Sequence, residues 1–293
     1  MAPKLNAWLT RWSPQMSSLD KCYLAKVHDV LLTSCDGKPL ATNTLRRRFN
    51  NVSKLLDAAV RSGLLDANEF TKPSRATYSA CKPKKHNAAY PNVTQMLELL
   101  VSVESHQPSS RMYRAMTAIG ALAGLRPSEV VALEVEDLNL PEEGWGVLRV
   151  ERARIGLAGF SEDSEEIGEP KVELSVRTIP MIPALVRELR LWLEYSGVET
   201  GALFRTRNGR IPTQSNWGRC LSLATKRAGT RSMTPYDLRR FHGTFLAESG
   251  VPYNEAARRM GHTLETFVRY YVHVTVDVTE MGNAALDRAF QGQ

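Results

Sequence analysis

The N-terminal quarter of the chain has a helical pattern of apolar positions. The segment TNTLRRRFNNVSKLLDAAVRSGLL, from residue 42, places apolar side chains at three- and four-residue steps, the period of one helix face. That face is expected to hold Leu45, Phe49, Val52, Leu55, Leu56 and Val60. Thr42 or Thr44 is suited to cap the helix, and Gly63 is suited to end it. We predict that residues 1–75 form a small helical domain.

The pattern stops in the next segment. Residues 71–92 contain three prolines and several basic side chains, without a helical period. This composition is typical of a linker between domains. We predict a basic linker over residues 76–91.

A second domain is expected over residues 92–293. Helical patterns run to about Gly124 and again through PALVRELRLWLEYSG. Between them, GWGVLRVER and KVELSVRTI have the alternation of strands, and the acidic GFSEDSEEIGE joins them as a loop. In the second strand, one face is expected to carry Val172, Leu174 and Val176, and the other Lys171, Glu173, Ser175 and Arg177. The chain is therefore predicted to be mainly α with a small β-hairpin or sheet, an α+β fold of two domains.

The composition is that of a globular protein. Hydrophobic residues make up 43% and charged residues 24% of the 293 positions, and no apolar run approaches the roughly 20 residues that cross a bilayer. The N-terminal sequence lacks the pattern of a secretory signal. The four cysteines show no CxxC spacing, so neither a disulfide framework nor a zinc site is expected. We expect a cytoplasmic protein without a membrane partner.

The net charge of +7 is concentrated in two blocks. Residues 1–90 contain 15 Lys and Arg against 6 Asp and Glu, and residues 202–262 contain 11 against 3. Two basic blocks favour two surfaces that bind one polyanion, with an unevenly charged solvated surface as the alternative. DNA contacts are expected from Arg46, Arg47 and Arg48 in the first helix and from Lys82, Lys84 and Lys85 in the linker.

The segment GLRPSEVVAL, residues 124–133, is the first of three polar motifs. Pro127 suits the first position of a helix, so Arg126 lies just before a helix N-terminus, where phosphate binds readily. Glu129 is near enough in sequence to support the guanidinium group. An ordinary arginine–carboxylate pair on a loop explains this motif equally well.

The second motif is MTPYDLRRFHGTFLAESG, residues 233–250. Thr234 and Asp237 are suited to begin a helix. Tyr236, Arg239 and His242 step by three and share one face of it. An arginine on an otherwise apolar helix needs an anionic partner, because unpaired buried charge is costly. That partner is either a ligand or an ordinary ion pair.

The third motif is RRMGHTLETFVRYYVHV, residues 258–274. Gly261 is suited to end one helix, and His262 then lies in the turn before the next. Neighbouring helical residues point about 100° apart, so Tyr270 and Tyr271 cannot face the same target. Taken alone, such an aromatic pair belongs to a hydrophobic core.

Taken in order, these motifs resemble the tyrosine recombinase family, which includes the phage integrases. Its members carry an arginine in G-L-R-x-x-E/D, a lysine on a β-hairpin, H-x-L-R, G-H and a tyrosine nine residues beyond that histidine. The corresponding residues here are Arg126, Lys171, Arg239, His262 and Tyr271. The resemblance covers residues 92–280 and makes Tyr271 the nucleophile and Tyr270 its packing neighbour.

The resemblance implies a site-specific DNA recombinase that needs no metal, cofactor or ATP. Tyr271 would attack a DNA phosphate and form a 3′-phosphotyrosyl link. Arg126 and Arg239 would hold the non-bridging oxygens, and Lys171 would protonate the departing 5′ oxygen.

The remaining roles are supporting ones. His262 would contact the phosphate or the tyrosine, and Glu129 would orient an arginine or the histidine. Tyr236 stands where the family has histidine before L-R, although a phenol still donates a hydrogen bond to a phosphate oxygen. His242 is an alternative stand-in for that histidine. Val172 follows Lys171 where the family has threonine.

The resemblance also implies partners. Residues 1–75 resemble the family's core-site DNA-binding domain, so the two domains would clamp double-stranded DNA at recombination sites, and four copies would act on two duplexes. The tail after Tyr271 would dock on a neighbouring copy or cap its own domain. Accessory factors that bend DNA or set direction are further partners. There is little room before residue 5 for an arm-site domain, so the chain works without one or is a fragment.

Two other functions stay open at this point. A DNA-binding protein with this fold that has lost catalysis is favoured by Tyr236. A type IB topoisomerase shares the same chemistry and would relax supercoils without site preference.

Overall fold

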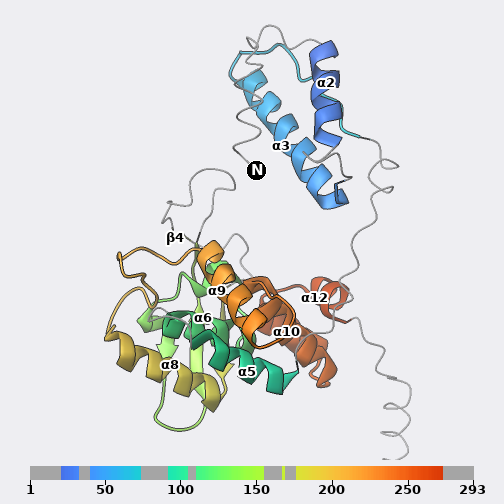
Figure 1. Ribbon diagram of the computed structural model, residues 1–293. Coiled ribbons are helices and arrows are strands. Elements are labelled where there is room, and N and C mark those ends of the chain that lie inside the picture. Colours follow the sequence, from blue (N-terminus) through green and yellow to red (C-terminus); the bar gives the residue numbers. More distant parts are fainter. Residues whose placement is uncertain are drawn as a thin grey trace, which may run out of the picture. The chain divides into compact units, whose positions relative to one another are not determined.

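The computed structural model describes residues 21–32, 40–73, 92–104, 110–154, 167–168 and 176–272. The chain divides into two compact units, residues 1–89 and 90–293 (Figure 1). The first contains α2 (Lys21–Leu32) and α3 (Thr42–Arg61). The second contains α5 (Val93–Glu104), α6 (Ser110–Leu122), α7 (Pro127–Val130), η2 (Val135–Asp137), β1 (Leu138–Asn139), β2 (Gly146–Val150), β3 (Ala153–Arg154), β4 (Ile167–Gly168), β5 (Arg177–Met181), α8 (Pro183–Ser196), α9 (Gln214–Arg227), α10 (Pro235–Glu248), α11 (Tyr253–Met260) and α12 (Leu264–Tyr271). The predicted fold class, mainly helical with a small antiparallel sheet, is confirmed.

The first unit is built on the apolar faces of α2 and α3. The ring of Phe49 is fully buried between them and stacks on Phe70, with 5.6 Å between the ring centroids. The spacing of apolar residues predicted this helix and its core face. Leu55 is exposed, contrary to the prediction, because Leu56 takes the core position one step further round the helix.

The central helix of the second unit is α6. Its side chains Met116 and Ile119 are fully buried, and α5, α8, α9 and α10 pack around it. Trp217 of α9 enters the same core, where its indole N–H donates to the Thr117 hydroxyl oxygen at 3.2 Å. This buried polar pair is therefore satisfied. None of the described helices is both long and apolar enough to cross a membrane.

A three-stranded antiparallel sheet has the order β1–β2–β5. The predicted pairing of the two longer strands is confirmed, with Val150 opposite Arg177. The alternation of the second strand left open which side faces the core, and in the structure Arg177, Ile179 and Met181 point inward whereas Val176 is exposed. Strand side chains alternate, so the apolar pair that enters the core carries Arg177 inward with it.

The last three described helices form a separate core. Leu246 of α10, Met260 of α11 and Phe267 of α12 meet there. Gly261 ends α11 at a φ of 60°, a left-handed conformation that favours glycine. The chain therefore turns at once into α12, which packs against α10 (Figure 1).

Candidate active site

Glu129 is the buried centre of a cluster of arginines. Only 1% of its side chain is exposed, yet its carboxylate accepts hydrogen bonds from two arginine side chains. Arg126 donates from Nη1 to Oε1 at 2.7 Å and from its backbone N–H to Oε2 at 2.8 Å. Burial raises the pKa of Glu129, but the hydrogen bonds and charge of Arg177, with the charges of Arg126 and Arg239, lower it below the ordinary value. The carboxylate is therefore ionised.

Arg239 lies on the buried side of α10. It donates from Nη1 to the Gly124 carbonyl at 2.7 Å and from Nη2 to the Met260 carbonyl. Burial and then the charge of Arg126 lower its pKa to about 10, while the Tyr271 phenol and Glu129 oppose that fall. The guanidinium group nevertheless keeps its charge at neutral pH. It is a buried cation close to Tyr271.

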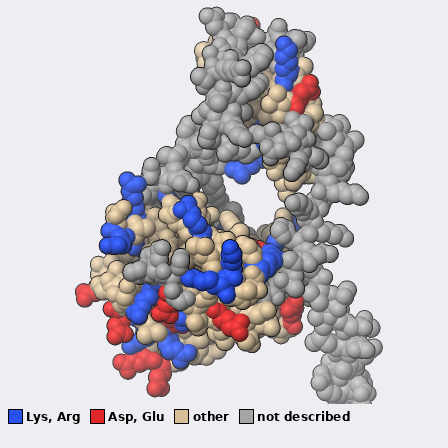
Figure 2. Space-filling model, in the orientation of Figure 1, with Lys and Arg blue, Asp and Glu red and all other residues tan. Residues whose placement is uncertain are grey.

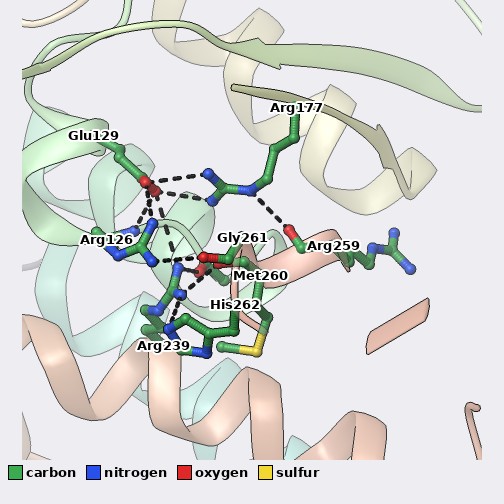
Figure 3. Close-up of polar contacts among 9 residues, drawn as sticks. Arg126, Glu129, Arg177, Arg239, Arg259, Met260, Gly261 and His262 are labelled. Atoms are coloured by element: carbon green, nitrogen blue, oxygen red, sulfur yellow. Dashed lines mark hydrogen bonds and ion pairs between the residues drawn. The ribbon is translucent and has the colours of Figure 1, made fainter. Parts of the chain in front are cut away.

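The C-terminal end of α11 offers three successive carbonyl groups to three arginines (Figure 3). The carbonyls of Arg259, Met260 and Gly261 accept from Arg177, Arg239 and Arg126, respectively. The last carbonyls of a helix have no partner within it and form the negative end of its dipole. One carboxylate and one helix end together hold three cations, which therefore keep a net positive charge.

His262 follows this helix end directly. Its Nε2 lies 2.7 Å from Nη2 of Arg239. A guanidinium group only donates, so Nε2 accepts and the ring proton of the neutral imidazole is on Nδ1. Burial, followed by the charges of Arg239 and Arg126, lowers the pKa of His262 to about 3. The imidazole is thus neutral and is a weak base at physiological pH.

Tyr271 is the buried member of the tyrosine pair. Its ring stacks beside His262, with 5.7 Å between centroids, and 6% of the residue is exposed. Tyr270 is 53% exposed, so the expectation that it packs in the core is wrong. Gly243 of α10 lies against the Tyr271 ring, and a Cβ at that glycine would be 2.5 Å from Cδ1.

Two residues of the site, Arg177 and Gly243, were not predicted from the sequence. Arg177 donates to both carboxylate oxygens of Glu129, from Nη1 at 3.1 Å and from Nη2 at 2.9 Å. Its place in the motif K-x-x-x-S-x-R was visible, but the alternation of KVELSVRTI grouped it with the polar residues of the strand and did not say which side is buried. No sequence signal distinguished Gly243 from other helical glycines.

Three other residues that the sequence suggested for the site, Tyr236, His242 and Lys171, are not part of this cluster of contacts as the structure describes it. Tyr236 lies in the first turn of α10 and is 55% exposed. His242 is buried, and its Nδ1 lies 3.1 Å from the Ala121 carbonyl. Because His242 faces α6, it does not replace the family histidine. Lys171 lies outside the described residues, as do the linker lysines Lys82, Lys84 and Lys85.

The exposed face of α3 carries the other predicted DNA contacts. Arg46 and Arg47 are exposed, whereas Arg48 is partly buried and donates to the Leu31 carbonyl of α2. Lys54 is exposed two turns beyond Arg47, on the same side of the helix.

Residues 92–277 match the model of the phage integrase family. The tyrosine recombinase XerC of Proteus mirabilis is 26% identical over 267 residues, which cover 91% of this chain and 76% of XerC. The tyrosine recombinase XerD of Staphylococcus saprophyticus is 25% identical over 201 residues, which cover 65% of this chain and 61% of XerD. The chain thus spans less than two thirds of the length of that XerD.

Two solved structures share the fold. The integrase of the Tn1549 transposon, in complex with transposon right end DNA, has a TM-score of 0.65 at 20% identity, covering 90% of this chain and 85% of that one. The XerH site-specific recombinase bound to difH substrate has a TM-score of 0.60 at 16% identity, covering 90% and 70%. At these identities the likeness concerns the fold alone.

Proposed function

The chain belongs to the phage integrase family, and from this membership we propose that it is a site-specific DNA recombinase whose nucleophile is Tyr271. One observation carries the proposal. Arg126 and Arg239 share one buried carboxylate, and the ring of His262 joins this cluster to Tyr271.

The charge of the cluster supports this chemistry. Three arginines, one ionised carboxylate and a neutral imidazole leave two net positive charges. A phosphodiester under attack by a phenolate carries two negative charges in its pentacoordinate state. Fixed charges that match a transition state in a buried site lower its free energy, commonly by about 3 kcal/mol for each donor.

The reaction that follows conserves the phosphate bond. The Tyr271 oxygen bonds to phosphorus, its proton passes to water, and the bond to the 5′ oxygen breaks. We assign the protonation of that oxygen to Lys171. The 3′-phosphotyrosyl link stores the bond energy, so a 5′-hydroxyl of another strand reseals it without ATP.

Roles for His262 and Tyr236 follow from their surroundings. A histidine whose pKa is about 3 is a poor general base, so we assign His262 to hold Arg239 and Tyr271 in place. Tyr236 is exposed in the first turn of α10 and is assigned to donate a hydrogen bond to a phosphate oxygen.

We also propose the partners of this reaction and the compartment in which it takes place. The partners are double-stranded recombination sites in the bacterial cytoplasm, a tetramer of this chain, and accessory factors that set direction. Charge on the second unit supports a DNA-facing side, because Lys and Arg gather near α9, whereas Asp and Glu gather along the edge that carries α8 (Figure 2).

Covalent trapping tests the proposal. The full chain is incubated with a random-sequence library of duplexes that each carry one nick, so that cleavage near the nick releases a short strand and prevents resealing. Denaturing gels then separate covalent complexes, whose DNA is sequenced. We expect wild type to yield complexes of a defined sequence and Tyr271→Phe to yield none.

The controls separate the alternative functions. No covalent complex from wild type, with DNA binding intact, would identify a DNA-binding protein without catalysis and contradict the proposal. Equal amounts of covalent complex from wild type and Tyr271→Phe would contradict the assignment of Tyr271 as the nucleophile. Covalent complexes without a shared sequence would indicate a topoisomerase, which relaxation of a supercoiled plasmid would then reveal.

A further inference from the structure

Arg177 is the cation of the cluster whose side chain donates to both oxygens of Glu129. Its side chain is 3% exposed, as is that of Arg239, whereas that of Arg126 is 27% exposed. It extends from β5, whereas Arg126 precedes α7 and Arg239 belongs to α10. Its Nη1 and Nη2 donate to the two oxygens of Glu129 and its Nε donates to the Arg259 carbonyl, so we assign it no direct contact with a DNA phosphate.

The contacts of the Glu129 carboxylate explain what Arg177 does in the cluster. Its two oxygens are held by the two nitrogens of the Arg177 fork, at 3.1 and 2.9 Å. The Nη1 of Arg239 lies 3.9 Å from Oε2, which is an ion-pair distance but not a hydrogen bond. A carboxylate held bidentately by Arg177 cannot rotate onto Arg239. The donors of Arg239 therefore stay directed at the Gly124 and Met260 carbonyls and at His262.

The second contact of Arg177 connects the cluster with the nucleophile helix. Its Nε donates to the Arg259 carbonyl at 2.9 Å, one residue before the carbonyl that receives Arg239. This carbonyl belongs to the last turn of α11, and α12 with Tyr271 begins four residues after Met260. The same guanidinium group thus fixes Glu129 and the helix end from which Tyr271 is presented (Figure 3).

We propose that Arg177 is a positioning residue for strand cleavage. It holds Glu129 away from Arg239 and anchors the end of α11, so that both substrate-facing arginines and Tyr271 keep their spacing. This inference rests on the proposed recombinase function.

The electrostatics of Glu129 agree with this role. The charged and titratable groups that face it are Arg126 before α7, Arg177 on β5, Arg239 on α10 and His262 after α11. Burial alone raises the pKa of Glu129, and the hydrogen bond from Arg177 is the largest influence that lowers it. Without Arg177, only Arg126 donates hydrogen bonds to the carboxylate, which is then able to turn toward Arg239.

The test measures covalent-complex formation on the nicked duplex recovered with wild type. The variants are Arg177→Gln, Arg177→Lys, Glu129→Gln and the double variant Arg177→Gln/Glu129→Gln. Arg114→Gln is the matched control, because Arg114 makes a similar two-pronged ion pair with Glu188 outside the site. Thermal unfolding and non-covalent duplex binding are measured for each variant.

We expect Arg177→Gln to slow covalent-complex formation by about 10- to 100-fold, by analogy with the loss found when groups that orient metal ligands are removed. Arg177→Lys should lie between this variant and wild type. The salt dependence of duplex binding should not change, since Arg177 contacts no phosphate. Arg114→Gln should lower the unfolding temperature and keep the wild-type rate.

The double variant distinguishes an effect of Arg177 on the reaction from an effect on folding. It removes one cation and one anion together, so the net charge of the cluster stays at two, and it should fold better than Glu129→Gln, in which three arginines face no carboxylate. In the Glu129→Gln background, we expect the loss of Arg177 to slow the reaction less than it does in wild type, because only its contact with the Arg259 carbonyl then remains to be lost.

Two results overturn the inference. One is a wild-type rate for Arg177→Gln, and the other is an undiminished effect of Arg177→Gln when Glu129 is already replaced. Failure of wild type to form covalent complexes would contradict the recombinase proposal instead. Failure of that proposal and failure of the inference about Arg177 are therefore distinguishable.

Discussion

At the scale of single residues, the site depends on a glycine without a side chain as well as on charged groups. Gly243 has no side chain, and the ring of Tyr271 occupies that space together with the Met260 sulfur. A Cβ would lie 2.5 Å from the ring and 2.9 Å from the sulfur, distances that real contacts do not reach. The position of the proposed nucleophile is therefore set partly by a glycine on another helix.

Replacement of this glycine should displace Tyr271. We expect Gly243→Val to reduce covalent-complex formation by about 100-fold, the loss that follows a misplacement of about 1 Å. The control is Gly218→Val on α9, where a Cβ would meet only Pro235 at an ordinary 3.7 Å. Equal rates for the two valine variants would contradict this account of Tyr271.

His242 predicts a pH dependence of stability. Burial lowers its pKa to about 4 from an ordinary 6.5, although the Ala121 carbonyl favours the proton. A histidine with a lowered folded-state pKa contributes full stability above about pH 6.5 and loses it as the pH falls toward 4. We expect the free energy of unfolding of the second unit to decrease by about 2 kcal/mol between pH 7 and pH 5 from this group.

Denaturant titrations at the two pH values measure that decrease. The variant His242→Gln cannot take up the proton, so its unfolding free energy should vary less with pH than that of wild type. A pH dependence as steep as that of wild type would show that other groups are responsible.

At the scale of elements, helix ends and faces determine which residues meet. The end of α11 brings three carbonyls to three arginines, and the left-handed Gly261 places His262 beside Arg239. In the first unit, α3 turns a polar face outward that carries Asn43, Arg47, Asn50, Asn51, Lys54 and Arg61. Amide and guanidinium groups on one exposed helix face are suited to phosphates and base edges.

The α3 face predicts salt-dependent DNA binding. Each phosphate contact that is lost should reduce the slope of log affinity against log salt by about one. We expect Arg47→Ala/Lys54→Ala to weaken binding of a 30-base-pair duplex at low salt and to reduce the slope by about two. Arg187→Ala, on the exposed side of α8, is the control and should leave the slope unchanged. An unchanged slope in the double variant would exclude α3 as a phosphate contact.

At the scale of the whole molecule, the chain separates a helical unit from a larger unit that holds all the clustered site residues. The basic block predicted over residues 202–262 includes exposed Arg205, Arg207 and Arg210, whereas Glu142 and Glu194 are exposed near α8. Charges of opposite sign on different parts of one unit favour a defined orientation on a polyanion.

The sequence by itself predicted the long helix from residue 42, the pairing of the two longer strands and the order of the motifs, because local periodicity and spacing are written along the chain. It identified Arg126, Glu129, Arg239, His262 and Tyr271, and these residues do lie together. It also required that Tyr270 and Tyr271 face different ways, since a helical step is about 100°.

Only the tertiary structure decided which way each faces and how the cations are held. Strand alternation does not say which face is inside, and only the packing of Ile179 and Met181 in the core shows that Arg177 points inward with them. The carbonyls that bind the arginines belong to the backbone and have no letter in the sequence. Such contacts join residues up to 135 positions apart, and they form only when α7, β5, α10 and α11 pack together.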